Sequence, residues 1–168
     1  ADQLINFPDF RAYERAFQLM SQVAGRAGRR NKQGSVIIQT YRPSHPVIRS
    51  VINHDFRDFF NEQIGDRETF KYPPFYRLIK IAVKHKGNVK VQEASDELAT
   101  LLRNTLGHRV LGPETPYVPR IRNLYIRNIM VKVEKSGISL AAVKAAIKTS
   151  IETLSARKDK KTVSFIAD

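Results

Sequence analysis

Glycine and arginine alternate in the stretch QVAGRAGR near the N-terminus. On a helix, Gln22, Arg26 and Arg29 follow one another at spacings of four and three residues, so their side chains share one face. A guanidinium is always charged and binds phosphate oxygens as a fork. Gly25 and Gly28 each cost about 1 kcal/mol in a helix, but they let an anion or another domain approach the backbone. The pattern predicts a phosphate-facing helix; the alternative is a solvated basic helix end.

A second stretch, PRIRNLYIRN, places three arginines around a tyrosine. Guanidinium groups bind phosphates while an aromatic ring stacks on an exposed base, which is how proteins hold single-stranded nucleic acid. Two lysines on the polar side of an earlier strand extend this basic set. The candidate nucleic-acid-binding residues are therefore Arg120, Arg122, Tyr125, Arg127, Lys80 and Lys84. The alternative is a tyrosine of the core within a solvated arginine loop.

The charge balance favours a polyanionic partner. The 168 residues hold 29 lysines and arginines against 16 acidic residues, a net charge of +13, which favours nucleic acid first. Residues 1–42 hold seven basic and three acidic residues, residues 43–78 hold five of each, and residues 79–168 hold 17 and eight. The surplus therefore lies toward both ends. We expect the charge run RKDKK at 157–161 to be a solvated turn.

Composition also excludes several classes of site. The chain has no cysteine, so it forms no disulfide and no thiolate zinc site. Its four histidines are scattered without ligand spacing, so we expect no metal site. There is no apolar run of about 18 residues, so we expect no membrane span, and we do not expect the first residues to be a signal peptide, because there is no basic start followed by an apolar block. The first residue is not methionine, which suggests a fragment of a longer protein.

The N-terminal part is predicted to be the end of an α/β unit. Apolar residues recur at helical spacing over 11–28, and Asp9 is a suitable N-cap. The segment 35–41 is apolar enough for a strand buried on both faces. Two short helices should follow, one capped by Ser44 and the other by Asp55.

The C-terminal part has a regular alternation of strands and helices. Prolines in YPPF (72–75) exclude helix and mark a boundary. Strands are predicted at 78–85, 109–113, 124–134 and 162–168, and helices at 91–107 and 139–154. The order β-α-β-β-α-β is typical of the ferredoxin-like fold, in which two helices pack on one face of a four-stranded sheet. The expected fold class is thus α/β followed by α+β, with parts at 1–42, 43–75 and 76–168.

The strand at 124–134 raises a problem of phase. Strict alternation places Tyr125 and Arg127 on the same face as the apolar residues Ile129, Val131 and Val133. Either the strand begins near Asn128, or a bulge changes the phase. The residues alone leave both alternatives open.

The motif QVAGRAGR resembles motif VI of superfamily 2 helicases, whose pattern is Q-x-x-G-R-x-G-R. The longer segment NFPDFRAYERAFQLMSQVAGRAGR, with GSVIIQT, HPVI, YPPF and LGPETP downstream, resembles the C-terminal part of the PriA family of bacterial replication-restart helicases. The resemblance implies that residues 1–42 end a RecA-like helicase lobe. It also implies that Arg26 and Arg29 face the γ-phosphate of ATP, with Arg29 as the arginine finger. Gln22 would contact the nucleotide or the interface, and Gly25 and Gly28 would permit lobe closure.

The chain departs from that family in two ways. It has no G-x-x-x-x-G-K-[ST] phosphate loop and no acidic Walker B strand. The zinc-binding cysteines of the family are also missing. We therefore expect no ATP hydrolysis and no cofactor in this chain alone, whereas ATP with magnesium and structural zinc are implied for the parent protein.

The resemblance implies a function. Such a parent is an ATP-dependent 3′-to-5′ DNA helicase that binds forked or single-stranded DNA and restarts stalled replication by primosome assembly. The implied partners are single-stranded DNA-binding protein and other primosome proteins, and no membrane is implied as a partner. The implied location is the bacterial cytoplasm, at the nucleoid. Two alternatives stay open: a helicase from another superfamily 2 branch, and a nucleic-acid-binding module without motor activity.

Overall fold

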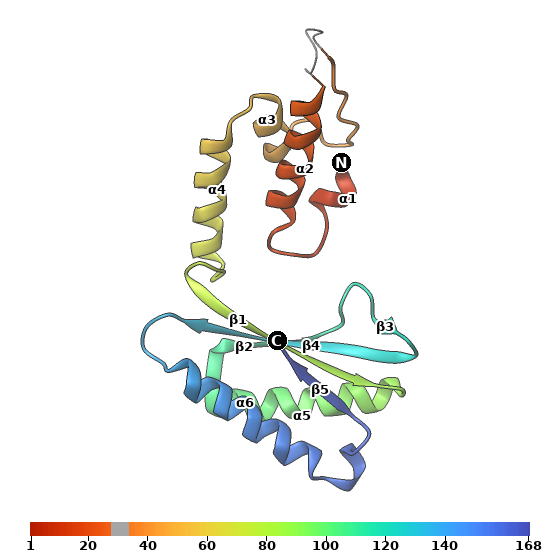
Figure 1. Ribbon diagram of the computed structural model, residues 1–168. Coiled ribbons are helices and arrows are strands. Elements are labelled where there is room, and N and C mark those ends of the chain that lie inside the picture. The colour runs from red at the N-terminus through yellow and green to blue at the C-terminus, as the bar shows by residue number, and fades with distance from the viewer. Residues whose placement is uncertain (28–33) are drawn as a thin grey trace. The chain divides into compact units, whose positions relative to one another are not determined.

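The computed structural model describes residues 1–27 and 34–168 and shows two compact units, residues 1–70 and 71–168 (Figure 1). Unit 1 is helical and unit 2 combines helices with a sheet. Gly28 and Arg29 of the predicted phosphate-facing motif lie outside the described residues.

Unit 1 contains the helices α1 (Asp2–Ile5), α2 (Ala12–Arg26), α3 (Pro46–Ile52) and α4 (Phe56–Thr69). Apolar side chains at helical spacing on α2 meet those of α3 and α4, and the rings of Phe17 and Phe59 stack with centroids 4.4 Å apart. The buried core of this unit consists of Ile5, Ala16, Phe17, Met20, Val47, Ile48, Val51 and Phe59. The helices predicted over 11–28 and after positions 44 and 55 are therefore present, with their ends shifted.

Only one of three predicted caps is confirmed. Asp55 is the N-cap of α4, and its Oδ1 accepts a hydrogen bond from Asp58 N at 3.0 Å. The N-cap of α3 is His45 rather than Ser44, because the His45 Nδ1 accepts from Val47 N at 3.3 Å. Arg11 occupies the N-cap position of α2. The Asp9 carboxylate instead accepts from the backbone N–H of that arginine, at 2.8 Å.

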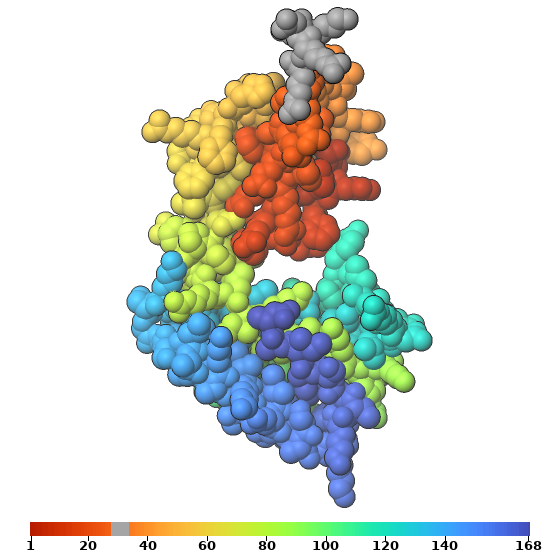
Figure 2. Space-filling model, viewed as in Figure 1, coloured from red at the N-terminus to blue at the C-terminus, as the bar shows by residue number. Residues whose placement is uncertain are grey.

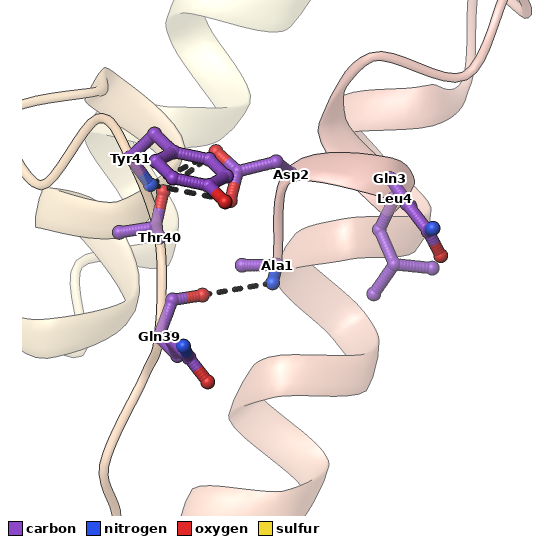
Figure 3. A pocket seen from close by; sticks show the side chains of 7 residues that line it. All are labelled: Ala1, Asp2, Gln3, Leu4, Gln39, Thr40 and Tyr41. Atoms are coloured by element: carbon purple, nitrogen blue, oxygen red, sulfur yellow. Dashed lines mark hydrogen bonds between the residues drawn. The ribbon is translucent and has the colours of Figure 1, made fainter.

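The strand predicted at 35–41 is wrong. Among the described residues this segment pairs with no strand, and Ile37 is 91% exposed. Side-chain bonds hold its end instead: Asp2 accepts from the Thr40 hydroxyl at 2.9 Å and from Tyr41 N (Figure 3). The physical reason is that a strand needs a neighbour for its backbone hydrogen bonds, and the described part of unit 1 contains no other strand.

Unit 2 is built on a five-stranded antiparallel sheet. Its elements are β1 (Tyr76–His85), α5 (Asn88–Leu106), β2 (Val110–Glu114), β3 (Arg120–Ile121), β4 (Leu124–Glu134), α6 (Leu140–Ser155) and β5 (Ser164–Ala167), with 3₁₀ turns at Gly107–Arg109 and Lys158–Lys160. The strand order is β2-β4-β1-β5, and β3 pairs only with β4. All four strands and both helices predicted here are present. The prediction missed β3.

Helices α5 and α6 cover one face of this sheet (Figure 1). Alternate residues of β1 and β4 point into the core between sheet and helices, because side chains on a strand alternate between faces. The core includes Ile81, Val83, Leu98, Leu102, Ile129, Val131, Val143 and Leu154. The other face carries the lysines of β1, and we call it the open face.

The phase problem of β4 has neither of the expected solutions. The strand starts at Leu124, and it pairs with β1 residue for residue from Tyr125 to Glu134 without a bulge. The only register shift lies in its pairing with β2, between Leu111 and Glu114. Tyr125 and Arg127 therefore do lie on the helix-covered face, at the end of the strand.

Candidate functional site

The predicted phosphate-facing helix is α2, and its described motif residues are exposed. Gln22 and Arg26 lie on the surface of the unit, and Arg26 is the last residue of the helix. Among the described residues, Arg26 makes no ion pair with a carboxylate. A Cβ added to Gly25 would meet no atom within 4 Å, so packing inside unit 1 does not require glycine there.

The same helix surface is partly apolar. Leu19 is 46% and Val23 is 57% exposed, although both are large apolar residues on a helix. A shallow hollow of about 390 Å³ is lined by Arg15, Gln18, Leu19 and Gln22. The exposed face of α2 therefore combines motif residues with apolar surface.

The candidate nucleic-acid-binding arginines lie on a β-hairpin that sequence reasoning missed. Strands β3 and β4 are joined by a two-residue turn of Arg122 and Asn123, with φ of 47° and 65°. Two positive φ angles are typical of the type I′ turn, whose twist fits a hairpin. The usual signal for this turn is Asn-Gly or Asp-Gly. Because arginine rarely adopts positive φ, the sequence does not indicate the turn.

Arg120 is held flat on the hairpin. Its guanidinium carbon lies 4.9 Å from the centroid of the Tyr125 ring, and its Nη2 donates to Asn123 Oδ1 at 2.8 Å. Tyr125 is half-buried and packs against the core of unit 2. The tyrosine therefore supports the arginine, and the guanidinium is what the hairpin presents to solvent.

Arg127 forms hydrogen bonds with the segment that leads into the hairpin. Its side chain is half-buried, with Nη1 donating to Thr115 Oγ1 at 3.2 Å and Nη2 to the Pro113 carbonyl at 3.4 Å. Its Nε is buried without a hydrogen-bond partner in the described structure. These bonds tie β4 to the chain after β2, so Arg127 positions the loop before β3.

Lys80 and Lys84 lie on the opposite side of the sheet from Tyr125 and Arg127. In the register of β1 and β4, Lys80 stands opposite Met130 and Lys84 opposite Ile126, on the open face. On the same face, the Lys132 Nζ lies 3.8 Å from the centroid of the Tyr72 ring. Burial, and then the charge of Lys71, lower the Lys132 pKa. The six candidate residues thus do not form a single surface.

The described ion pairs of unit 2 involve basic residues other than the hairpin arginines. Residues 71–168 hold 19 of the 29 basic residues and eight of the 16 acidic ones. Arg109 Nε donates to the Glu134 carboxylate at 2.9 Å, and this bond lowers the Glu134 pKa to about 2. Other carboxylates pair with Lys148, Arg157 and Lys160. In the described structure, no acidic side chain pairs with Arg120 or Arg122.

The expectation that RKDKK is a fully solvated turn is wrong at one residue. Lys160 is only 4% exposed, and its Nζ lies 2.8 Å from Glu97 Oε1 of α5. This hydrogen bond, opposed by burial, raises the Lys160 pKa. A buried lysine needs such a partner, and here the ion pair fixes the turn to α5.

The described residues contain neither a metal-binding cluster nor a candidate membrane span. No group of three or more histidine, aspartate or glutamate side chains lies close enough to hold a metal ion. No helix there is long and apolar enough to cross a membrane.

Comparison with known proteins identifies the family. The sequence profile of the primosomal protein N C-terminal domain matches residues 68–168. The replication restart protein PriA of Bacillus subtilis is 37% identical over 137 residues, which cover 80% of this chain and 17% of that protein. PriA of Synechocystis is 40% identical over 134 residues, with 79% and 16% covered, and PriA of Thermotoga maritima is 40% identical over 133 residues, with 79% and 18% covered.

The chain thus spans less than a fifth of the length of these relatives. The predicted resemblance is confirmed by the profile match and by identities of 37–40% over about four fifths of the chain. The chain belongs to the PriA replication-restart family, and its residues 68–168 correspond to the C-terminal domain of that family.

Proposed function

We propose that this chain acts in replication restart as the C-terminal part of an ATP-dependent 3′-to-5′ DNA helicase. In this proposal, unit 2 is a ferredoxin-like domain that binds forked DNA, and unit 1 ends the second motor lobe. The name of the relatives, replication restart protein, supports the role. The strand order β2-β4-β1-β5 with two helices on one face supports the ferredoxin-like assignment.

One observation carries the DNA-binding proposal. Arg120 and Arg122 are exposed on a preformed hairpin, without an acidic partner in the described structure, in a unit with more than twice as many basic as acidic residues. A guanidinium with no carboxylate partner is available to a phosphate. Because the hairpin fixes the backbone under both residues, less side-chain and backbone freedom is lost on binding.

The experiment is a salt titration of binding to forked DNA by the whole chain. Neutralising phosphates releases counterions, so the logarithm of the affinity should fall linearly with the logarithm of salt concentration. Changing Arg120→Ala and Arg122→Ala together should reduce that slope by about 1.4 to 1.8, depending on how much of the contacted DNA is duplex. Fluorescence anisotropy of labelled DNA measures both quantities.

A matched control removes the same charge elsewhere. Lys144 and Lys158 are exposed on α6 and on the following turn, and their double alanine variant should keep the slope of the wild type. If both double variants lower the slope equally, diffuse charge rather than the hairpin binds DNA. An unchanged slope in the arginine variant removes the hairpin from the interface.

We propose a nucleotide role for unit 1. Gln22, Arg26 and Arg29 would face the phosphates of ATP bound by another part of the parent protein. The exposure of Gln22 and Arg26 supports this role. ATP with magnesium would supply the free energy for unwinding, while these residues would contribute positive charge and hydrogen-bond donors. Zinc does not fit this chain, which has no cysteine to hold it.

The nucleotide proposal has a direct test. The chain carries no phosphate loop, so purified protein should hydrolyse no ATP above background. In a longer protein that includes the other lobe, Arg29→Ala should reduce hydrolysis by about 10³-fold or more. ATP hydrolysis by the present chain that disappears in Arg29→Ala would contradict the proposal that another part of the parent protein binds the ATP.

The proposed partners follow from the same role. We propose that the parent contacts single-stranded DNA-binding protein and other primosome proteins at the fork, in the cytoplasm at the nucleoid. Co-sedimentation of the chain with single-stranded DNA-binding protein would test the first contact.

A further inference from the structure

We infer that the β3–β4 hairpin recognises the branch point of forked DNA by placing apolar side chains against bases exposed at the end of a duplex. This inference rests on the proposed DNA-binding function and names the part of the DNA that the site recognises. The hairpin and the loop before it, residues 115–123, form the recognition element. In Figure 2 this teal region stands out at the edge of unit 2.

The first observation is the apolar surface of this element. Tyr117 is 79%, Val118 is 50% and Ile121 is 51% exposed. These residues lie within five positions of one another, between Pro116 and the turn at Arg122. Apolar groups that face water gain about 25 cal/mol for each Å² that a partner buries, so three exposed apolar side chains in one short segment indicate a binding surface.

The second observation is the charge that surrounds the apolar side chains. Arg120 and Arg122 flank Ile121 in sequence, and no described ion pair neutralises either arginine. Successive side chains alternate between the faces of a strand, so Arg120 lies on the face of Tyr125, while Ile121 pairs with Leu124 on the other face. An apolar side chain with an arginine before and after it in the sequence fits a base that lies between two phosphates.

The third observation is that the element is held in place before DNA arrives. The ring of Tyr125 supports the Arg120 guanidinium at 4.9 Å, and Arg127 ties the loop down through Thr115 and Pro113. Arg122 has φ of 47°, a conformation that favours glycine or asparagine. A side chain kept at an unfavourable turn position indicates that the guanidinium itself is used there.

These features together favour a branch point over an intact duplex. The bases of a duplex are stacked on both sides, whereas the terminal pair at a branch has one open face. Isoleucine and similar side chains act as wedges that enter such steps and partly unstack them, and aromatic rings and guanidinium planes stack on unpaired bases. Phosphate contacts from Arg120 and Arg122 would set the register of the hairpin on either strand.

The experiment compares forked DNA with a linear duplex of the same composition. The DNA carries 2-aminopurine, whose fluorescence rises when it unstacks, at the branch point of the fork or at the matching internal position of the duplex. The whole chain should increase the fluorescence of the fork and leave the duplex unchanged. Ile121→Ala should abolish the increase and weaken binding to the fork by about fivefold or more, with duplex affinity unchanged.

A matched control is available on the same sheet. Ile166 of β5 is 41% exposed on the open face, so Ile166→Ala removes an equally accessible isoleucine outside the element. The Ile166→Ala variant should bind the fork and unstack the 2-aminopurine at its branch point as the wild type does. Tyr117→Ala and Val118→Ala should resemble Ile121→Ala, and circular dichroism should confirm that all variants are folded.

The possible outcomes distinguish this inference from the proposed DNA-binding function on which it rests. If the chain binds no DNA, both are wrong. Suppose that the chain binds forks, that Ile121→Ala keeps the wild-type affinity, and that 2-aminopurine fluorescence does not change. The DNA-binding proposal then stands, and branch recognition by the hairpin is wrong. Equal losses in Ile121→Ala and Ile166→Ala would mean that the open face as a whole, rather than the hairpin, contacts the DNA, which also overturns the inference.

Discussion

Unit 2 buries Leu98, Ile129 and Leu154 completely, whereas unit 1 leaves Leu19 46% and Phe56 62% exposed. Both units contain amphipathic helices, but among the described residues only those of unit 2 meet a sheet that covers their apolar sides. Unit 1 also contains an apolar segment, 35–41, with no strand beside it among the described residues.

The difference teaches that the two units are independent to different degrees. A sheet with two helices on one face encloses a core by itself. In our proposal, unit 1 belongs to a larger motor lobe, and its exposed apolar side chains pack there. The DNA-binding role should therefore survive isolation of unit 2, while the nucleotide role needs the rest of the parent.

The sharpest test of this contrast compares one leucine from each unit. Leu98→Ala removes a fully buried side chain from α5 and should lower the free energy of unfolding of unit 2 by about 2 to 5 kcal/mol. Leu19→Ala removes a side chain that is 46% exposed, so it should change stability by about 0.5 kcal/mol or less. Urea denaturation followed by circular dichroism measures both. Equal losses would show that the two cores are closed to the same degree.

A second test compares one glycine from each unit. Gly112 has φ of 90°, and an added Cβ would lie 2.9 Å from the Asn128 carbonyl oxygen. Gly112→Ala should therefore destabilise unit 2 by about 2 kcal/mol. Gly25 has open space for a Cβ, so Gly25→Ala should stabilise α2 by about 1 kcal/mol.

The glycine comparison also tests the proposed role of motif VI. If Gly25 is kept for close approach of another domain, Gly25→Ala should impair ATP hydrolysis in the longer protein although it stabilises this chain. Thermal unfolding of the chain and steady-state hydrolysis by the longer protein give the two readings. A destabilised chain would mean that Gly25 serves the fold of unit 1 instead.

The smallest effect expected is a pH dependence confined to unit 2. The bond to Arg109 lowers the Glu134 pKa from 4.5 to about 2. A carboxylate with a lowered pKa stabilises the folded state above its unfolded pKa, and this contribution is lost as the pH falls from about 4.5 toward 2. Glu134→Gln should therefore lose less thermal stability than the wild type between pH 5 and pH 3. Identical losses of thermal stability in Glu134→Gln and in the wild type would show that the Arg109–Glu134 pair contributes nothing to the stability of the folded state.

Much of unit 2 could be predicted because its pattern is local. Alternating apolar residues predicted β1 and β4, and helical spacing predicted α5 and α6 to within a few residues at each end. The strand expected at 35–41 failed because a buried strand depends on neighbours, which composition does not reveal. Its apolar residues predict burial, but the described part of unit 1 offers them no sheet.

The sequence predicted which residues belong to the candidate site better than it predicted how they are arranged in space. Arg120 and Arg122 were found by type and spacing, but their hairpin depends on positive φ at Arg122, which no sequence rule indicates. Placing Tyr125 under Arg120 required the register of β4. Lys160 was missed for a similar reason, since its partner Glu97 lies far away in sequence.

The central claim is that unit 2 binds DNA by itself, and isolated residues 71–168 test it most directly. Anisotropy titrations should give the same affinity for forked DNA, within about threefold, for residues 71–168 and for the whole chain, because the proposed interface lies within unit 2. Both should bind the fork more tightly than a linear duplex. A folded 71–168 that binds no DNA, or binds both forms equally, would contradict the account.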